Sequence, residues 1–492
     1  MLPLINLYIY FYLFRAASSS IMTTPPLSAL IVAFESVYDL SLLANTLSDQ
    51  GIDTTLIIPS YSENDLYNNL IDVEVLKLNV NIDKSATVDK HALEACDSLF
   101  RDDEIMKKIR EFQPTFTIFP ALRHDGCLLP FVKYIESIPV IWIKNPDEEL
   151  YALECTGVAL PIHSGGFWSR LTTSFAGRSI FSAAKNDYLT PALKLAIKYL
   201  PDVNFDLDHL YSDVRLVLWG ADTVLRSSFA VLSQLLVEVG CHHCRGVHPL
   251  SGDLQKSLIE HRLGTIVALL DKNYEILIQE LAKKLPQGRE GQAIVWRINK
   301  GETSIAAPEN LFIRGDIDRQ DLIGYSRTRV VLSHCAETEF LEVAFHGTPV
   351  ICLPRDTHES RNSARAVELG FARSIENGYD SAEEMANVVH EMHETAAYRE
   401  NARKVSLAIR DRLNPASDRL IYWLNYVART KDDDRKFHRA KSQTRTLTED
   451  IQFFVGLLVG VIFGIVSTGC AVVARYLMTA SKVQKSKGRY TR

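Results

Sequence analysis

Several features that mark other protein classes are missing from this sequence. Its 492 residues hold only eight cysteines, whose spacing shows no disulfide framework, and contain no Asn-x-Ser/Thr site for N-glycosylation. The net charge of −6 lacks the basic excess typical of nucleic-acid binders. No Gly-x-Gly-x-x-Gly follows the first predicted strand, which argues against a dinucleotide-dependent oxidoreductase. The remaining expectation is an ordinary globular chain of two or three domains.

The longest uncharged run lies near the C-terminus, at residues 451–474. As a helix it would span ~36 Å, enough to cross a hydrocarbon core of ~30 Å. The alternative is a buried core helix, but such helices seldom stay uncharged beyond ~14 residues. The tail at 475–492 carries six basic residues and no acidic one. We therefore predict a transmembrane helix with a cytosolic tail, the preceding chain being lumenal or outside.

The N-terminal end also has an apolar stretch, at residues 2–14, followed by Arg15 and small residues. This order predicts a signal peptide-like segment over 1–20, although no Lys or Arg precedes the stretch. A short anchor or hydrophobic strand is the alternative. Residues 431–450 are expected to form a charged spacer before the membrane helix.

The middle of the chain alternates apolar runs with helical patterns. Such alternation predicts α/β architecture with parallel sheets covered by helices on both faces. We expect two doubly wound, Rossmann-like domains at 27–240 and 254–430, joined by a linker at 241–253, with ligands bound at the carboxyl ends of the strands. The expected strands are 28–34, 54–59, 115–119, 140–143, 214–219, 264–270, 293–297, 330–333 and 350–353, and the expected helices 40–50, 275–284, 337–345 and 360–369.

The cysteines are expected to be mostly reduced, buried small residues. The Cys-His-His-Cys sequence at 241–244, with His248 nearby, has residue types that bind metals. No second ligand pair follows at zinc-site spacing, so a turn with incidental Cys and His is favoured and no metal site is predicted.

The most informative run is 321–370, which predicts strand, tight turn, helix, strand, loop and helix. His334 closes a strand, and a helix begins within three residues. The N-terminus of a helix favours anions, so His334 and this terminus would suit a phosphate. Glu342, two turns along, would accept hydrogen bonds from ribose hydroxyls. A capped helix with incidental polar residues explains the same pattern equally well.

This run resembles the donor-binding signature of the UDP-glycosyltransferases, the GT-B group that includes membrane-bound glucuronosyltransferases. The resemblance covers most of residues 28–490, including the order of the returning helix, the apolar span and the basic tail. The matching positions are Asp321, Leu322, Ile323, Ser333, His334, Glu342, Gly347, Pro349, Pro354 and Asn362.

The resemblance implies a GT-B fold with an acceptor-binding N-terminal domain and a nucleotide-sugar-binding C-terminal domain whose last helix, after Pro415, packs back across both. The protein would transfer a sugar from a UDP-sugar, its co-substrate, to a small lipophilic acceptor, with no other cofactor. It would be a single-pass type I protein of the endoplasmic reticulum membrane, mostly lumenal, alone or in an oligomer with other transferases. The implied donor-binding residues are Ser333, His334 at the diphosphate, Glu342 at the ribose, Asn362 at the donor loop, and His358 and Glu359 at the sugar-contacting pair.

The sequence departs from the family at the base. The family's catalytic His corresponds to Ser36, counted back from Gly51, and its Asp partner to Ala121. Serine does not act as a base near neutral pH without an activator, whereas imidazole does. His124 and Asp125 would substitute if their loop folded back, so the catalytic candidates are Ser36, His124 and Asp125. A solvated loop pair is the favoured alternative for the last two.

The donor side departs as well. Asp316 and Arg319 stand near the positions of the uracil-stacking aromatic and the uracil-contacting Gln, and Cys335 with Ala336 replaces the Gly-Gly turn. Glu337 and Glu339 add negative charge where a phosphate would bind. Two hypotheses follow: an active, divergent transferase, which family resemblance favours, and a catalytically impaired homologue that acts as a binding or regulatory partner.

Overall fold

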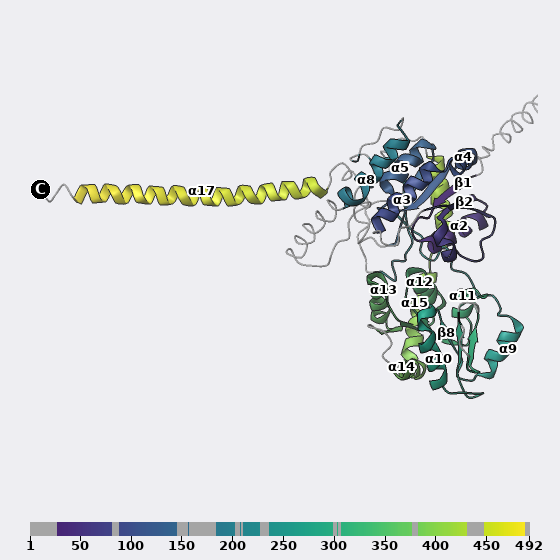
Figure 1. The fold of residues 1–492 in the computed structure, drawn as a ribbon. Helices are drawn as coiled ribbons and strands as arrows, with labels where there is room; N and C mark the ends of the chain where they lie inside the picture. Colours follow the sequence, from purple (N-terminus) through teal and green to yellow (C-terminus); the bar gives the residue numbers. More distant parts are fainter. Residues whose placement is uncertain are drawn as a thin grey trace, which may run out of the picture.

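The computed structural model contains two α/β domains and one long C-terminal helix (Figure 1). It describes residues 27–80, 88–144, 156, 184–201, 207, 210–226, 236–298, 303, 307–375, 382–430 and 447–487. The proposed signal segment at 1–20 lies outside these residues, as does most of the charged spacer.

The N-terminal domain is built on a seven-stranded parallel sheet of order β3-β2-β1-β4-β5-β6-β7. Its inner strands are mostly apolar, as expected for strands that helices cover on both faces. The strands are β1 (Ser28–Val32), β2 (Asp53–Pro59), β3 (Val73–Leu78), β4 (Phe116–Pro120), β5 (Ile138–Ile143), β6 (Leu216–Trp219) and β7 (Leu236–Glu238). The helices are α2 (Val37–Asp49), η1 (Ser60–Asp65), α3 (Val88–Arg101), α4 (Asp103–Phe112), α5 (Asp125–Tyr134), η2 (Ala184–Leu189) and α8 (Thr190–Tyr199).

The C-terminal domain repeats this plan with a six-stranded parallel sheet of order β10-β9-β8-β11-β12-β13. Two apolar clusters pack on its opposite faces. The strands are β8 (Thr265–Ala268), β9 (Ala293–Trp296), β10 (Leu311–Ile313), β11 (Thr328–Ser333), β12 (Val350–Cys352) and β13 (Ala372–Ser374). The helices are α9 (Gly252–Glu260), η4 (Lys272–Tyr274), α10 (Glu275–Lys284), α11 (Arg319–Ile323), α12 (Glu337–His346), α13 (Thr357–Glu368), α14 (Ala382–Glu394) and α15 (Ala396–Arg410).

Both sheets reverse their strand order next to their first strand. In the first sheet β1 lies between β2 and β4, and in the second β8 lies between β9 and β11. Ligands of doubly wound sheets bind beyond the carboxyl ends of the strands at such a reversal. The loops after β1 and β11 are therefore placed to form a site, and the doubly wound prediction is confirmed in both domains.

One helix from the end of the chain belongs to the first domain. Helix α16 (Ala416–Arg429) begins after Pro415 and packs on β6 and β7. Its apolar face buries Leu420, Leu424 and Val427 in the N-terminal core. Pro415 is the N-cap of α16, a place where its missing N–H costs no helical hydrogen bond. The resemblance implied a helix that packs across both domains, and the described contacts of α16 with strands are those with β6 and β7 of the first.

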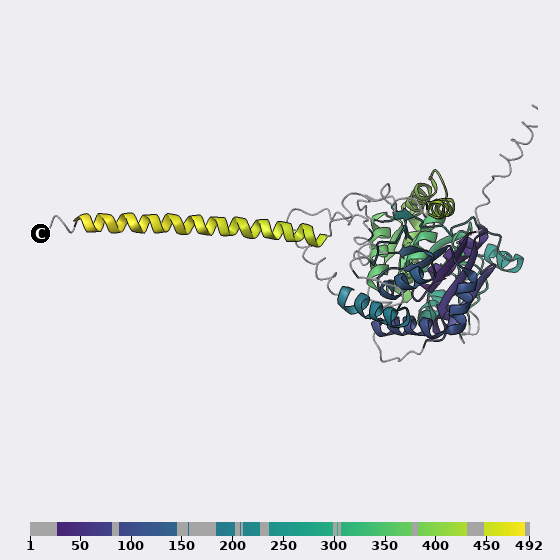
Figure 2. The ribbon, with the colours of Figure 1, turned by 90° about the horizontal axis from the view of Figure 1, so that it is seen from above.

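The last helix, α17 (Leu447–Lys487), is far longer than the others. Both views show it outside the globular part (Figures 1 and 2). Residues Val455–Thr479 are apolar enough to cross a membrane, with a mean hydropathy of 2.4 and none of this window buried. A buried core helix would show the opposite, so the prediction of an apolar, membrane-spanning type of helix is supported, with later bounds than 451–474.

The prediction for the cysteines is wrong. Three disulfides join Cys96 to Cys127, Cys241 to Cys244 and Cys335 to Cys352, with Cα–Cα distances of 6.3, 4.8 and 5.5 Å. Spacing did not reveal them because packing brings together residues 31 and 17 positions apart. The Cys-His-His-Cys turn is closed by its own disulfide, and no group of metal-ligating side chains occurs among the described residues.

Candidate functional site

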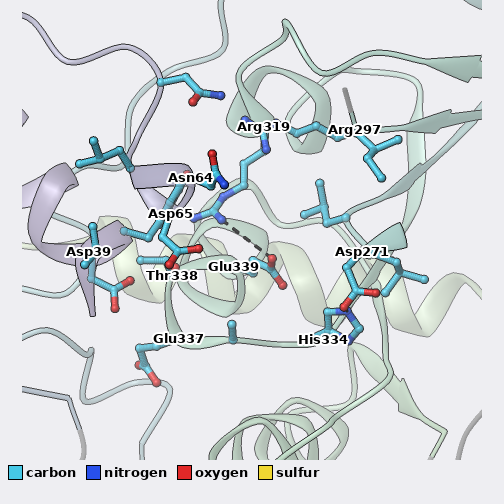
Figure 3. Close-up of a pocket in the computed structure, with 18 of the residues that line it drawn as sticks. Asp39, Asn64, Asp65, Asp271, Arg297, Arg319, His334, Glu337, Thr338 and Glu339 are labelled. Atoms are coloured by element: carbon cyan, nitrogen blue, oxygen red, sulfur yellow. Dashed lines mark ion pairs between the residues drawn. The ribbon is translucent and has the colours of Figure 1, made fainter. Parts of the chain in front are cut away.

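A cavity of about 670 Å³ lies between the two domains, at the strand reversals. Residues from the N-terminus of α2 and the end of β5 form one wall, and the ends of β8, β9 and β11 with the start of α12 form the other (Figure 3). Its charged lining residues are Asp39, Asp65, Lys144, Asp271, Lys272, Arg297, Arg319, His334, Glu337, Glu339 and Arg355.

The N-terminal wall contains a tight turn after β1. Ser36 stands at the N-cap of α2 in the left-handed region, with φ of 56°, although it is not glycine. Such a conformation is uncommon for a residue with a Cβ and is concentrated at functional sites. Ser36 lines the cavity, as does Asp39 one turn further along α2, whose carboxylate is paired with Lys144.

The C-terminal wall keeps a comparable turn. Cys335 also takes a left-handed conformation, with φ of 60°, where glycine was expected from the resemblance. Its N–H donates to Ser333 Oγ at 2.8 Å, and its disulfide to Cys352 ties the ends of β11 and β12 together. Asn362 donates from Nδ2 to the Cys335 carbonyl at 2.9 Å. The turn before α12 is therefore held from three sides.

His334 is the best-placed phosphate ligand of this wall. Its Nδ1 lies 2.9 Å from the Leu353 carbonyl oxygen, which accepts only, so Nδ1 carries a proton. Its Nε2 has no hydrogen-bond partner among the described residues, and it lies 3.6 Å from Asp271 Oδ2. The ring lines the cavity (Figure 3). Protonated at both nitrogens, it would donate to an anion in the cavity.

The acids in the first turn of α12 are neutralised by arginines. Glu337 pairs with Arg226 and accepts from Asn362 at 3.3 Å, and Glu339 lies 3.9 Å from Arg319. Burial raises the pKa of Glu337, and Arg226 opposes this shift. The N-terminus of α12 has no side-chain cap within the described residues. Its N–H groups therefore retain capacity for an anion despite the nearby acids.

Glu342 lies deeper than a ribose ligand would be expected to lie. It is 1% exposed, and both carboxylate oxygens contact Arg319, one of them at 2.9 Å. Burial alone would raise its pKa, but Arg319 and His243 outweigh burial and lower that pKa to about 2. The Arg319 guanidinium also stacks 4.6 Å from the ring centre of Tyr38, which belongs to the other domain. Glu342 does not line the cavity, so its ribose role stays a prediction.

The implied sugar-contacting pair is also set back from the cavity. Glu359 is 4% exposed and binds Arg355, with one contact at 2.7 Å, while His358 lies half-buried on α13. Neither lines the cavity, whereas Arg355 does, 3.1 Å from Asp271. Sequence reasoning missed Arg355. Its position directly after Pro354, at the end of a predicted strand, was the available signal.

His124 and Asp125 are not a solvated loop pair, and that preference is corrected. They are 2% and 0% exposed, because Phe34 packs on the His124 ring and Tyr211 donates to Asp125 at 2.5 Å. Burial lowers the pKa of His124 to about 4 and raises the pKa of Asp125 to about 7. Neither lines the cavity beside Ser36. The three catalytic candidates are therefore not brought together.

The architecture first defines a class. Solved glycosyltransferases share the fold at low sequence identity: CalG4, the calicheamicin glycosyltransferase, has a TM-score of 0.55 and 14% identity, covering 82% of this chain and 100% of its own. Os79 from O. sativa, solved in complex with UDP, has a TM-score of 0.53 and 12% identity over 82% of this chain and 99% of its own. The chain is a GT-B glycosyltransferase fold with a C-terminal apolar helix.

The sequence defines the family. The pattern of the UDP-glucoronosyl and UDP-glucosyl transferase family matches residues 53–485, and the chain belongs to that family. Among curated relatives, UDP-glucuronosyltransferase 2C1 of Oryctolagus cuniculus is 22% identical over 44% of this chain and 42% of its own length. UDP-glucuronosyltransferase 2B14 of the same species is 24% identical over 50% and 46%. The matched part thus spans less than half of these relatives.

Proposed function

We propose that the protein transfers a sugar from a UDP-sugar to a small lipophilic acceptor. The observation that carries this proposal is that His334 Nε2, which has no hydrogen-bond partner among the described residues, lies beside the uncapped N-terminus of α12, both facing a cavity between the domains. A histidine ring that donates from Nε2 and helix N–H groups are suited to hold a diphosphate. Arg297 and Arg355 add positive charge to the same wall. The residues proposed to bind the donor are Ser333, His334, Glu342, His358, Glu359 and Asn362.

The proposed location is the endoplasmic reticulum membrane, with the two domains in the lumen and the tail in the cytosol. The apolar helix and the basic tail support this orientation. The three disulfides also support it, because such bonds persist in oxidising compartments. Self-association, or association with other transferases, is part of the same proposal.

One observation favours a second candidate, a catalytically impaired homologue that binds a ligand or an active partner. Arg319 engages both oxygens of Glu342, the carboxylate implied for ribose binding. Donor binding through Glu342 would have to break a buried ion pair. In this case the cavity would take a ligand other than a nucleotide sugar.

Nucleotide binding separates the two candidates. We expect the full-length protein in detergent to bind UDP, and His334→Ala to weaken that binding ~10- to 100-fold, because a hydrogen bond to a charged group contributes ~1.5–3 kcal/mol. His390→Ala, on the exposed face of α14, is the matched control and should bind like the parent. The impaired homologue would be favoured if the parent protein does not bind UDP at millimolar concentration. It should then also release no UDP from a panel of UDP-sugars with phenolic acceptors.

A further inference from the structure

The wall that faces the acceptor contains few groups able to take a proton. Of its described lining residues only Asp39 and Asp65 carry carboxylates, and Lys144 carries the one ammonium group. Asp65 is exposed at the end of η1, whereas Asp39 is 7% exposed. His124 and Asp125 lie in the core behind this wall. Asp39 is therefore the one shielded carboxylate that this wall turns toward the cavity.

Asp39 owes its position to the turn after β1. It follows Ser36 by three residues, and residues three apart share one face of a helix. Because Ser36 holds the left-handed turn at the start of α2, both side chains line the same cavity. The position where the family carries its His is thus followed, one turn later, by an acid on the same face.

Lys144 supplies the opposite charge from a separate strand. It follows β5 directly and pairs with the Asp39 carboxylate, so the two meet only because the sheet aligns the carboxyl ends of β1 and β5. The implied arrangement of the family is a basic imidazole balanced by a carboxylate. Here a carboxylate after β1 is balanced by an ammonium group after β5, a dyad with the signs exchanged.

The dyad also faces the donor wall. Asp39, Lys144 and Glu337 line one small adjoining cavity, so the pair lies against the start of α12. Figure 3 shows Asp39 on one side of the larger cavity and His334 on the other. An acceptor hydroxyl beside Asp39 and a diphosphate at His334 would leave the transferred sugar between them, which is the order that in-line displacement requires.

We propose that Asp39 is the general base of sugar transfer, oriented and charge-balanced by Lys144, and that transfer is fastest to the most acidic acceptor hydroxyls. This rests on the proposed function. The carboxylate takes the proton of the acceptor hydroxyl while the acceptor oxygen bonds to the anomeric carbon. The bond from that carbon to the diphosphate oxygen breaks, and UDP leaves with the electron pair. Inverting glycoside hydrolases use a carboxylate base in the same way to activate water.

The expected preference for acidic hydroxyls, such as those of phenols, follows from the base strength of a carboxylate. Carboxylates are weaker bases than imidazole, with reference pKa values near ~4 and ~6.5. A weak base assists best when the proton it removes is already acidic. A phenolic hydroxyl, with a pKa of ~10, is far more acidic than an aliphatic alcohol, whose pKa is near that of water. We therefore expect transfer to slow as the acceptor hydroxyl becomes less acidic.

The test measures transfer by the full-length protein to a series of phenols of increasing pKa. We expect Asp39→Asn to lower kcat ~10²- to 10⁴-fold without changing UDP affinity, and to lower it most for the least acidic phenols. Lys144→Met should lower kcat and shift its pH profile. Asp49→Asn, at the exposed far end of α2, is the matched control and should behave like the parent.

Four outcomes would count against the proposal. An Asp39→Asn variant within about threefold of the parent overturns the base assignment and leaves the transferase function standing. A loss that is equal for all phenols and accompanied by lost UDP binding makes Asp39 structural. If the parent protein binds UDP and transfers sugar to aliphatic alcohols but to no phenol, the expected preference for acidic hydroxyls is refuted. A parent with no transfer at all refutes the proposed function itself.

Discussion

Two buried carboxyl groups, one in each domain, have pKa values shifted in opposite directions. Asp125 in the first domain and Glu342 in the second are 0% and 1% exposed. Asp125 is hydrogen-bonded by Tyr211, and burial raises its pKa to about 7. Glu342 has Arg319 and His243 beside it, and its pKa falls to about 2. The two groups are about equally buried, but only Glu342 has an arginine beside it. Burial therefore raises the pKa of Asp125, whereas the cation lowers the pKa of Glu342.

The contrast extends to the two walls of the cavity. On the C-terminal side the acids are paired with arginines: Glu337 lines the cavity, and Glu342 and Glu359 lie behind it. The N-terminal wall carries a single pair, Asp39 with Lys144, directly at the cavity. The C-terminal wall is preorganised to hold a ligand. The N-terminal wall places at the cavity the carboxylate that is proposed to take a proton.

The largest effect is expected from Arg319→Ala. Removing the arginine leaves Glu342 buried without its cation, which costs about 3–5 kcal/mol in comparable buried pairs. Urea unfolding of the full-length protein in detergent would measure the loss. In a double-mutant cycle with Glu342→Gln we expect strong non-additivity, because the second change removes the stranded charge. Additive losses would mean that Arg319 and Glu342 do not stabilise each other.

The disulfides should rank by the length of chain they close. Loop-closure entropy predicts losses of about 4 kcal/mol for Cys96–Cys127, about 3 for Cys335–Cys352 and about 2 for Cys241–Cys244, whose partners are 31, 17 and 3 positions apart. Paired Cys→Ser variants compared by thermal unfolding would test this order. A larger loss at Cys241–Cys244 would show that its contribution does not come mainly from chain entropy.

The pH dependence should separate the two carboxyl groups. The pKa of Asp125 is raised above its unfolded value of 3.8, so its contribution to stability is present at low pH and lost as pH rises toward 7, by about 2 kcal/mol between pH 5 and 7. The pKa of Glu342 is depressed, so its contribution is present above pH 4.5 and lost as pH falls toward 2. Asp125→Asn should flatten only the first slope and Glu342→Gln only the second. Identical curves for Asp125→Asn and the parent would contradict this assignment.

The smallest effect concerns the turn after β1. Because Ser36 has φ of 56°, Ser36→Gly should stabilise the protein by about 0.5–1 kcal/mol, after the entropy that glycine adds to the unfolded chain. Ser48→Gly, inside the same helix, is the control and should destabilise by a similar amount. Differential scanning calorimetry is suited to both. A destabilised Ser36→Gly would indicate that the hydroxyl itself is needed.

Most strands were predictable because buried parallel strands are continuous apolar runs, which the sequence displays directly. Helix Glu275–Lys284 was predicted with the bounds that the structure has, since its apolar spacing is regular and it is flanked by charged turns. The turn at Cys335 lies where motif spacing places the family's Gly-Gly pair. Local pattern and motif order were sufficient for these features.

The partners of buried charges were not predictable. Asp125 is buried because Tyr211, 86 positions later, provides its hydrogen bond. Arg319 reaches Glu342 only because α11 packs on α12. The pairing of Asp39 with Lys144 depends on the order of strands in the sheet. Each contact joins segments whose proximity arises from tertiary packing, about which local sequence carries no information.

The return of α16 onto the first sheet also affects how the protein is made. Leu420, Leu424 and Val427 complete the core of the N-terminal domain, yet they are synthesised after every strand of the C-terminal domain. The first domain therefore cannot finish folding before the second has been translated. Only 28 positions separate Val427 from Val455, where the apolar span begins. The core of the N-terminal domain is therefore completed at about the time when the apolar helix emerges from the ribosome.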